Sequence, residues 1–233
     1  MSDLVIEARD GSGSFGGYLA TPESGGGPGI VVIQEIFGVN AAMRRICDWL
    51  AGEGYVAFCP DLFWRIEPGI ELTDKTDEEW QKAFELYKAF DVDKGVEDIA
   101  ATLKALRAHR TVNGRVGSVG YCLGGLLAYL TACRTSADAN VGYYGVGIDA
   151  HLDEAESMAG YLALHIAEED QFVDKAAQKR IHEALDEHPR VTIWDYPGVD
   201  HAFARPDGIN FNAEAAALAN RRTLDFFAKH LKD

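Results

Sequence analysis

A reactive cysteine flanked by glycines stands near the middle of the chain, in the motif Gly120-Tyr121-Cys122-Leu123-Gly124-Gly125. Residues 115–119 before it alternate like a short buried strand, and residues 126–131 after it are typical of a helix. A nucleophile between a strand and a helix sits at a sharp, strained turn, where Gly120 and Gly124 carry no Cβ atom that would collide. The motif therefore predicts a nucleophile elbow at Cys122. The alternative is a glycine-rich turn around a buried, inert cysteine.

A base must accompany this thiol. The free N–H groups and partial positive charge of a helix N-terminus favour the thiolate, but a thiol is mostly protonated at neutral pH. Active sites of parallel sheets gather at the carboxyl ends of strands. His201 follows the predicted strand at residues 191–196, and Asp170 follows the one at residues 161–167. We predict that His201 takes the proton of Cys122 and that Asp170 orients the imidazole and stabilises its charged form.

The chain order of these three residues supports the combination, because nucleophile, acid, histidine is the order of α/β-hydrolases. Alone, His201 would be interpreted as a surface loop histidine. The rival acids are Glu168, Glu169 and Asp174. Asp170 is preferred because it lies just beyond the strand, whereas Asp174 is typical of a helix cap. The other six histidines lie on helices, inside a strand or without catalytic neighbours.

A further carboxylate follows an early buried run, because Glu35 comes directly after residues 29–34. Its place at a strand end predicts that it lies near the elbow and holds the resting thiol protonated until substrate displaces it. A salt-bridged surface carboxylate is the alternative. The backbone N–H groups of Leu123 and Ile36 are the predicted oxyanion donors, one after the nucleophile and one after an early strand.

Strands alternate with helices along the chain, which predicts a mostly parallel central sheet with helices on both faces. Residues 4–8 and 15–20 flank a turn and predict an N-terminal antiparallel hairpin. Residues 61–76 have no clear period, and such a stretch is more often functional than idle. Buried strands are expected at residues 29–34, 55–60, 115–119, 141–145, 161–166 and 191–196, and helices at residues 40–51, 77–90, 93–109, 126–131, 175–186 and 212–229.

Composition limits the class of protein. The chain has 233 residues, of which 47% are hydrophobic, so we expect one domain over residues 1–233. A net charge of −15 argues against nucleic acid or an anionic membrane as partner, since the surface would repel both.

The sequence has no long apolar run and no basic-then-apolar N-terminus, so we expect a cytoplasmic protein. Four irregularly spaced cysteines predict reduced thiols without zinc. We expect a monomer or small homo-oligomer.

Along nearly its whole length the chain resembles the dienelactone hydrolase (carboxymethylenebutenolidase) family of α/β-hydrolases. The matching segments are Gln34-Glu35-Ile36-Phe37-Gly38, Cys59-Pro60-Asp61-Leu62, the cysteine motif, Gly142-Tyr143-Tyr144-Gly145, Asp170 and His201-Ala202-Phe203-Ala204-Arg205. The resemblance implies an α/β-hydrolase fold without a lid domain, no cofactor or metal, and a Cys-His-Asp triad. It also implies that Glu35 hydrogen-bonds the resting thiol and exchanges its proton when a lactone binds. Family members open an unsaturated lactone that carries a carboxylate, a step in degradation of chlorinated catechols.

One departure from the family concerns the substrate. Its enzymes hold the substrate carboxylate with two arginines; Arg205 matches the first, but Trp80 stands at the second position, and Phe84 replaces an expected tyrosine. Trp80 and Phe84 lie one helical turn apart, which predicts an aromatic wall of the pocket, although such a stripe is more often core. Losing one charged partner costs about 1.5 to 3 kcal/mol of recognition, and Arg65 is a candidate replacement. The other predicted substrate contacts are Phe37 and Tyr144.

Together these observations predict a cofactor-independent hydrolase that opens a lactone or ester, with dienelactone as the leading candidate. Two alternatives use the same residues: a hydrolase of another ester or thioester, and a non-catalytic thiol-redox or ligand-binding protein. The positions of Asp170 and His201 favour hydrolysis, since a redox sensor would not need them in this order.

Overall fold

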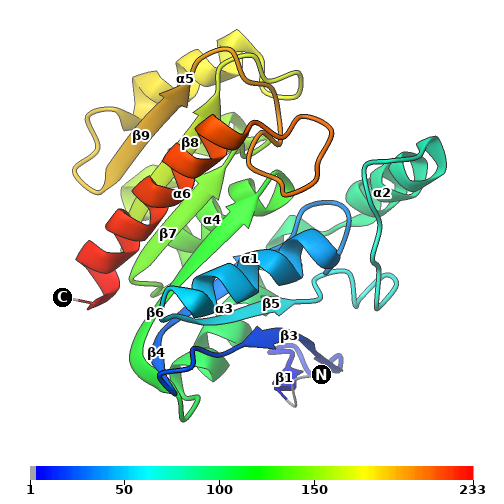
Figure 1. Cartoon of the computed structure of the whole chain (residues 1–233), viewed down its shortest axis with the longest axis vertical. Helices are drawn as coiled ribbons and strands as arrows, with labels where there is room; N and C mark the ends of the chain where they lie inside the picture. The colour runs from blue at the N-terminus through cyan, green and yellow to red at the C-terminus, as the bar shows by residue number, and fades with distance from the viewer. Residues whose placement is uncertain (1–3, 233) are drawn as a thin grey trace. The chain divides into compact units, whose positions relative to one another are not determined.

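The computed structural model describes residues 4–232 and divides into two compact units, with the boundary after Gly117. Strand β6 (Val112–Tyr121) runs across this boundary, and each unit has its own helices and strands (Figure 1). The single domain expected over residues 1–233 stays a prediction. Within residues 4–232, no helix has both the length and the apolar character needed to cross a membrane.

The first unit contains the predicted N-terminal hairpin, formed by β1 (Ile6–Glu7) and β2 (Ser14–Phe15) in antiparallel pairing. The prediction of one continuous second strand over residues 15–20 is wrong. The strand is interrupted at Gly16, and the separate strand β3 (Gly17–Ala20) pairs antiparallel with β5 (Val56–Pro60). A Cβ at Gly17 would lie 2.1 Å from the Cys59 carbonyl oxygen, so this close pairing depends on glycine. Strand β4 (Gly27–Ile33) runs parallel to β5.

Three helices complete the first unit: α1 (Ala41–Gly52), α2 (Asp77–Ala89) and α3 (Val92–Arg107). The side chains of Asn40, Thr76 and Asp91 cap their first turns by accepting backbone N–H groups. Helix α1 packs against β3, β4 and β5, and it buries an apolar stripe of Met43, Ile46, Cys47 and Leu50. The helices therefore begin and end within a few residues of their predicted positions.

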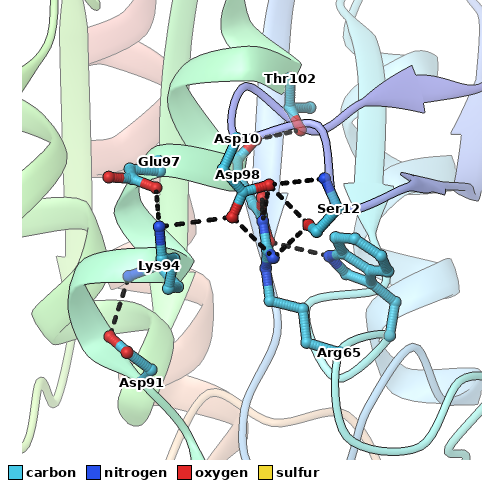
Figure 2. A network of polar contacts seen from close by, with 9 residues as sticks. Asp10, Ser12, Arg65, Asp91, Lys94, Glu97, Asp98 and Thr102 are labelled. Carbon is cyan, nitrogen blue, oxygen red and sulfur yellow. Dashed lines mark hydrogen bonds and ion pairs between the residues drawn. The ribbon is translucent and has the colours of Figure 1, made fainter.

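A polar network fixes the start of the irregular stretch between β5 and α2. Arg65 Nε and Nη2 donate to the two carboxylate oxygens of Asp98, each at 2.8 Å, and Trp64 Nε1 donates to the same carboxylate. Arg65 Nη1 donates to Ser12 Oγ at 2.7 Å and to Asp10 at 3.1 Å (Figure 2). The network thus joins the β1–β2 turn, the irregular stretch and α3. The hypothesis that Arg65 binds the substrate carboxylate is wrong, because its guanidinium is already occupied by these partners.

We predict that Asp98→Ala lowers the free energy of unfolding by about 2 to 3 kcal/mol. The change leaves Arg65 and the Trp64 N–H without their carboxylate, and breaking a buried pair costs about 3 to 5 kcal/mol before the partial exposure of Arg65 is considered. Glu97→Ala is the matched control, because Glu97 is the neighbouring helix acid and forms an exposed pair with Lys94. Its cost should stay below about 1 kcal/mol in the same denaturant titration. Equal costs for both variants would contradict the prediction.

The second unit holds three parallel strands that pair in chain order: β7 (Ala139–Tyr143), β8 (Tyr161–Ala167) and β9 (Val191–Tyr196). Its helices are α4 (Leu123–Arg134), α5 (Lys175–Leu185) and α6 (Ala213–Phe227), with short helical turns at η1 (Ile148–Ala150), η2 (Leu152–Ser157) and η3 (Ala228–Lys232). Helices α4 and α6 lie on the two sides of these strands (Figure 1). The mostly parallel strands, the antiparallel hairpin and the helices on both sides confirm the predicted fold class.

Candidate active site

Cys122 occupies the turn between β6 and α4, in the conformation predicted for a nucleophile elbow. Its φ of 58° and ψ of −115° lie outside the backbone regions that residues other than glycine favour. The strained peptide is held at both ends: the Cys122 N–H donates to the Tyr143 carbonyl at 3.1 Å, and its carbonyl accepts from Gly125 and Leu126. The residue is 8% exposed. Packing therefore holds Cys122 at the N-terminus of a helix and leaves a small part of the residue exposed.

The glycines around Cys122 allow two backbone segments to touch. A Cβ at Gly120 would lie 1.8 Å from the Gly124 carbonyl oxygen, and one at Gly125 would lie 2.6 Å from the Tyr143 carbonyl oxygen. Both contacts are far shorter than real Cβ contacts, and both partners are backbone atoms that cannot rotate away. The predicted steric role is confirmed for Gly120, whereas that of Gly124 stays a prediction; the second close contact falls at Gly125.

Gly120→Ala should destabilise the protein by about 3 kcal/mol or more, because overpacking against backbone exceeds the usual cost of about 1 to 3 kcal/mol for an added core methylene. Gly16→Ala is the matched control, since a Cβ there meets no atom within 4 Å. The control should change stability by less than about 1 kcal/mol. Thermal unfolding of both variants would measure the difference, and a Gly120→Ala protein as stable as the control would contradict the geometry.

Asp170 and His201 come together from the loops that follow two neighbouring parallel strands. Ala167 at the end of β8 pairs in register with Tyr196 at the end of β9, so both loops leave the same edge. The His201 Nδ1 atom lies 2.9 and 3.1 Å from the two Asp170 carboxylate oxygens. Both side chains are buried, with 3% and 1% exposure. Because a carboxylate only accepts, Nδ1 carries a proton and Nε2 is left for the reaction.

The loop around Asp170 fixes the carboxylate. The backbone N–H groups of Phe172 and Val173 donate to Asp170 Oδ1 at 2.8 and 3.2 Å. These bonds compensate for the burial of the charge. The rival acids have other roles: Asp174 caps α5 by accepting the Ala177 N–H, and Glu169 forms an exposed ion pair. The structure therefore brings Asp170, rather than its neighbours, to the histidine.

The charge state of His201 links the imidazole to the sulfur. Burial by itself lowers the pKa of His201, but the charge of Cys122 and hydrogen bonding to Asp170 and Cys122 outweigh it and raise the pKa to about 10. Among the described residues, Nε2 has no partner that meets strict hydrogen-bond geometry. The raised pKa and the absence of a well-aligned hydrogen bond are both explained by a sulfur that lies near the imidazole but is poorly aligned with Nε2. Such contacts commonly tighten only when substrate is bound.

Aromatic rings surround the imidazole. The ring centroids of Tyr144 and Phe172 lie 5.0 and 4.8 Å from that of His201, both edge-on. Tyr144 is itself strained, with φ of 39°, and packs against Phe203. The predicted residue Tyr144 therefore adjoins the triad, although its contact with substrate stays a prediction. Phe172 was missed by the sequence analysis; its position two residues after Asp170 was the available signal.

Several predicted site residues belong to the first unit. Glu35, Ile36 and Phe37 are buried in the segment that follows β4, so the alternative of a surface salt-bridged Glu35 is wrong. The rings of Phe37 and Phe84 lie 5.0 and 5.5 Å from that of Trp80. Phe37, Trp80 and Phe84 therefore form an aromatic cluster within this unit. Its contact with substrate, the role of Glu35 and the oxyanion role of Ile36 stay predictions from the sequence.

Two further predicted site residues, Leu123 and Arg205, lie in the second unit. Leu123 is the first residue of α4, where a backbone N–H has no partner within the helix. Its position directly after the nucleophile is the one expected of an oxyanion donor. Arg205 is buried, at 6% exposure, and follows His201 by four residues. Its contact with a substrate carboxylate stays a prediction.

This geometry can be compared with known proteins. The sequence profile of the Dienelactone hydrolase family matches residues 15–231. The chain belongs to this family. A protein of Azospirillum brasilense is 50% identical over 233 residues, which cover 99% of this chain and 100% of its relative. The carboxymethylenebutenolidase of Pseudomonas putida is 40% identical, covering 97% of this chain and 95% of that enzyme. Family membership makes this chain a carboxylic ester hydrolase.

The fold comparison agrees with the family. A dienelactone hydrolase-like promiscuous phosphotriesterase from metagenomic libraries superposes with a TM-score of 0.79 at 20% identity, covering 98% of both chains. At this identity the likeness shows the α/β-hydrolase fold alone. The fold predicted from the sequence is therefore confirmed.

We predict that Cys122→Ala lowers the pKa of His201 from about 10, because it removes the charge that raises it. The raised pKa means that proton binding by His201 stabilises the fold, fully below pH 6.5 and no longer above about pH 10. In the variant this stabilisation should vanish at a lower pH. An NMR titration of the histidine rings measures the shift. His165 is an internal control, since burial lowers its pKa to about 3 and no sulfur contributes to that shift. An unchanged His201 pKa would show that Cys122 is not its neighbour.

Proposed function

We propose that this protein opens a lactone or ester of the dienelactone type through a Cys122-His201-Asp170 triad. The observation that carries the proposal is the buried imidazole, whose Nδ1 is held by Asp170 at 2.9 Å while the charge of Cys122 raises its pKa. A strained cysteine at a helix N-terminus supplies the nucleophile. Membership of the Dienelactone hydrolase family supports a lactone or ester as the substrate.

The proposed reaction proceeds in two stages. His201 Nε2 takes the proton of Cys122, and the sulfur attacks the substrate carbonyl to form a tetrahedral oxyanion. The Leu123 and Ile36 N–H groups stabilise that oxyanion. The carbon–oxygen bond then breaks, the leaving alkoxide takes the proton from His201, and a thioester remains on Cys122. His201 next takes a proton from water, whose hydroxide attacks the thioester, and the thiolate leaves to recover the proton.

The substrate class follows from the predicted binding residues. Arg205 supplies one cation for a substrate carboxylate, and Glu35 exchanges a proton with the resting thiol when the lactone enters. Trp80 replaces the family's second arginine, and its contacts with Phe37 and Phe84 form an apolar surface. We therefore propose that the enzyme accepts lactones or esters that are bulkier or less charged than dienelactone, as well as dienelactone itself.

Cys122→Ala should reduce kcat for dienelactone and for 4-nitrophenyl acetate by at least about 10³-fold, because it removes the nucleophile. Asp170→Asn should reduce kcat by about 10² to 10⁴-fold, since it favours the wrong imidazole tautomer. Cys133→Ala is the matched control: this buried cysteine lies at the far end of α4 and should be dispensable. Steady-state kinetics measure all three.

Retention of the wild-type rate by Cys122→Ala would exclude Cys122 as the nucleophile. A protein that forms a reversible sulfenic acid at Cys122 under mild peroxide but cleaves no ester would instead be a thiol-redox sensor. Mass spectrometry of the peroxide-treated protein distinguishes these outcomes.

A further inference from the structure

A second polar bridge connects the two loops that carry the acid and the histidine. Asp200 directly precedes His201, and Gln171 directly follows Asp170. The Asp200 Oδ1 atom accepts the Gln171 backbone N–H at 3.0 Å, and Asp200 Oδ2 accepts the Gln171 side-chain amide at 3.0 Å. The Asp200–Gln171 bridge thus runs beside the Asp170–His201 contact and joins the same two loops.

The same carboxylate also holds the backbone of the histidine. Asp200 Oδ1 accepts the His201 N–H at 2.6 Å, so one oxygen receives a backbone N–H from each loop. Hydrogen bonds to a charged acceptor are about twice as strong as neutral ones and are directional. The distance between the two loops is therefore set at two neighbouring points, one by the triad pair and one by Asp200.

Backbone strain gives an independent reason for such a restraint. Ala202, directly after His201, has a φ of 64°, a left-handed conformation that costs about 1 to 3 kcal/mol outside glycine. Such a conformation persists only where its surroundings determine it. Here the His201 N–H is held by Asp200 and the His201 carbonyl accepts from the Asn210 side chain at 3.0 Å. Both ends of the histidine residue are thus fixed against relaxation of the strained peptide.

We propose that Asp200, acting through Gln171 and the His201 backbone, is a positioning residue that sets the imidazole against Asp170 and Cys122. The proposal rests on the triad proposed above. The side-chain hydrogen bonds of Asp200 go to Gln171 and to the His201 backbone rather than to the ring nitrogens, so its effect is on geometry. Half-burial of its side chain keeps it at the rim of the site. A misplacement of the imidazole by about 1 Å reduces catalysis by about 10²-fold, which defines the expected size of its contribution.

The first test is Asp200→Ala in the full-length protein with 4-nitrophenyl acetate. We expect kcat to fall by about 10- to 100-fold with KM within about twofold of wild type, since the imidazole is displaced while substrate binding is kept. Glu169→Ala is the control, because Glu169 is an exposed acid on the same loop as Gln171 and pairs only loosely with Lys175. It removes the same charge and should leave kcat unchanged.

The second test restores the bridge with its donor and acceptor exchanged. Gln171→Glu alone places two carboxylates, which both only accept, against each other, so kcat should fall by about 10-fold. Adding Asp200→Asn lets the Asn amide donate to the new carboxylate, while Asn Oδ1 still accepts both backbone N–H groups. The double variant should recover most of kcat. A residue needed only for folding would not give this recovery at an unchanged melting temperature.

Several outcomes would overturn the proposal: a wild-type kcat in Asp200→Ala, an effect confined to KM, or a double variant no better than Gln171→Glu. If Asp200→Ala does not fold, Gln171→Ala replaces it, since this variant keeps both backbone bonds of Asp200, and an unchanged kcat there counts against the bridge. Cys122→Ala is measured in parallel. If it retains its rate, the triad is wrong; if only the Asp200 variants retain theirs, the triad stands and the positioning role is wrong.

Discussion

The buried carboxylate–imidazole pair is the interaction on which the site depends. Removing a carboxylate and an imidazolium from water costs several kcal/mol for each ion, and the mutual attraction offsets this only when the remaining polar atoms are also bonded. Asp170 meets that condition because the N–H groups of Phe172 and Val173 bind its oxygen. The loop after β8 must therefore turn back at once, and the in-register pairing of β8 with β9 brings His201 within reach.

Three residues near this pair have a strained backbone. Cys122, Tyr144 and Ala202 all have positive φ although none is glycine. Each adjoins a peptide group whose hydrogen bond is made: Cys122 N–H to Tyr143, Tyr144 N–H to His165, and the Ala202 carbonyl from Arg205. Strained residues persist only where surrounding bonds determine them, and they often occur at functional sites. The coincidence of strain and titratable groups here indicates that the second unit is organised for fixed geometry rather than for maximal stability.

The proposed triad and the aromatic cluster around Trp80 belong to different units. The proposed triad of Cys122, His201 and Asp170 lies in the second unit. The aromatic cluster around Trp80 and the fully engaged Arg65 lie in the first unit. A scaffold supports many reactions by varying such residues while its core is retained. We propose that the aromatic cluster around Trp80 affects which substrates are favoured and leaves the nucleophile unchanged.

The sequence alone predicted the helices and strands and named the proposed catalytic residues. Glycine spacing predicted the elbow because the steric conflict is local, and the apolar period of α1 with its Asn40 cap depends on neighbours within one helical turn. The contact between Asp170 and His201 was predictable because strand ends restrict which residues can meet. Tertiary structure alone decided the rest: the break between β2 and β3, the partners of Arg65, the ring of Phe172 on His201, and the Asp200 bridge. These depend on distances between segments far apart in the chain, and no periodicity or composition encodes such distances.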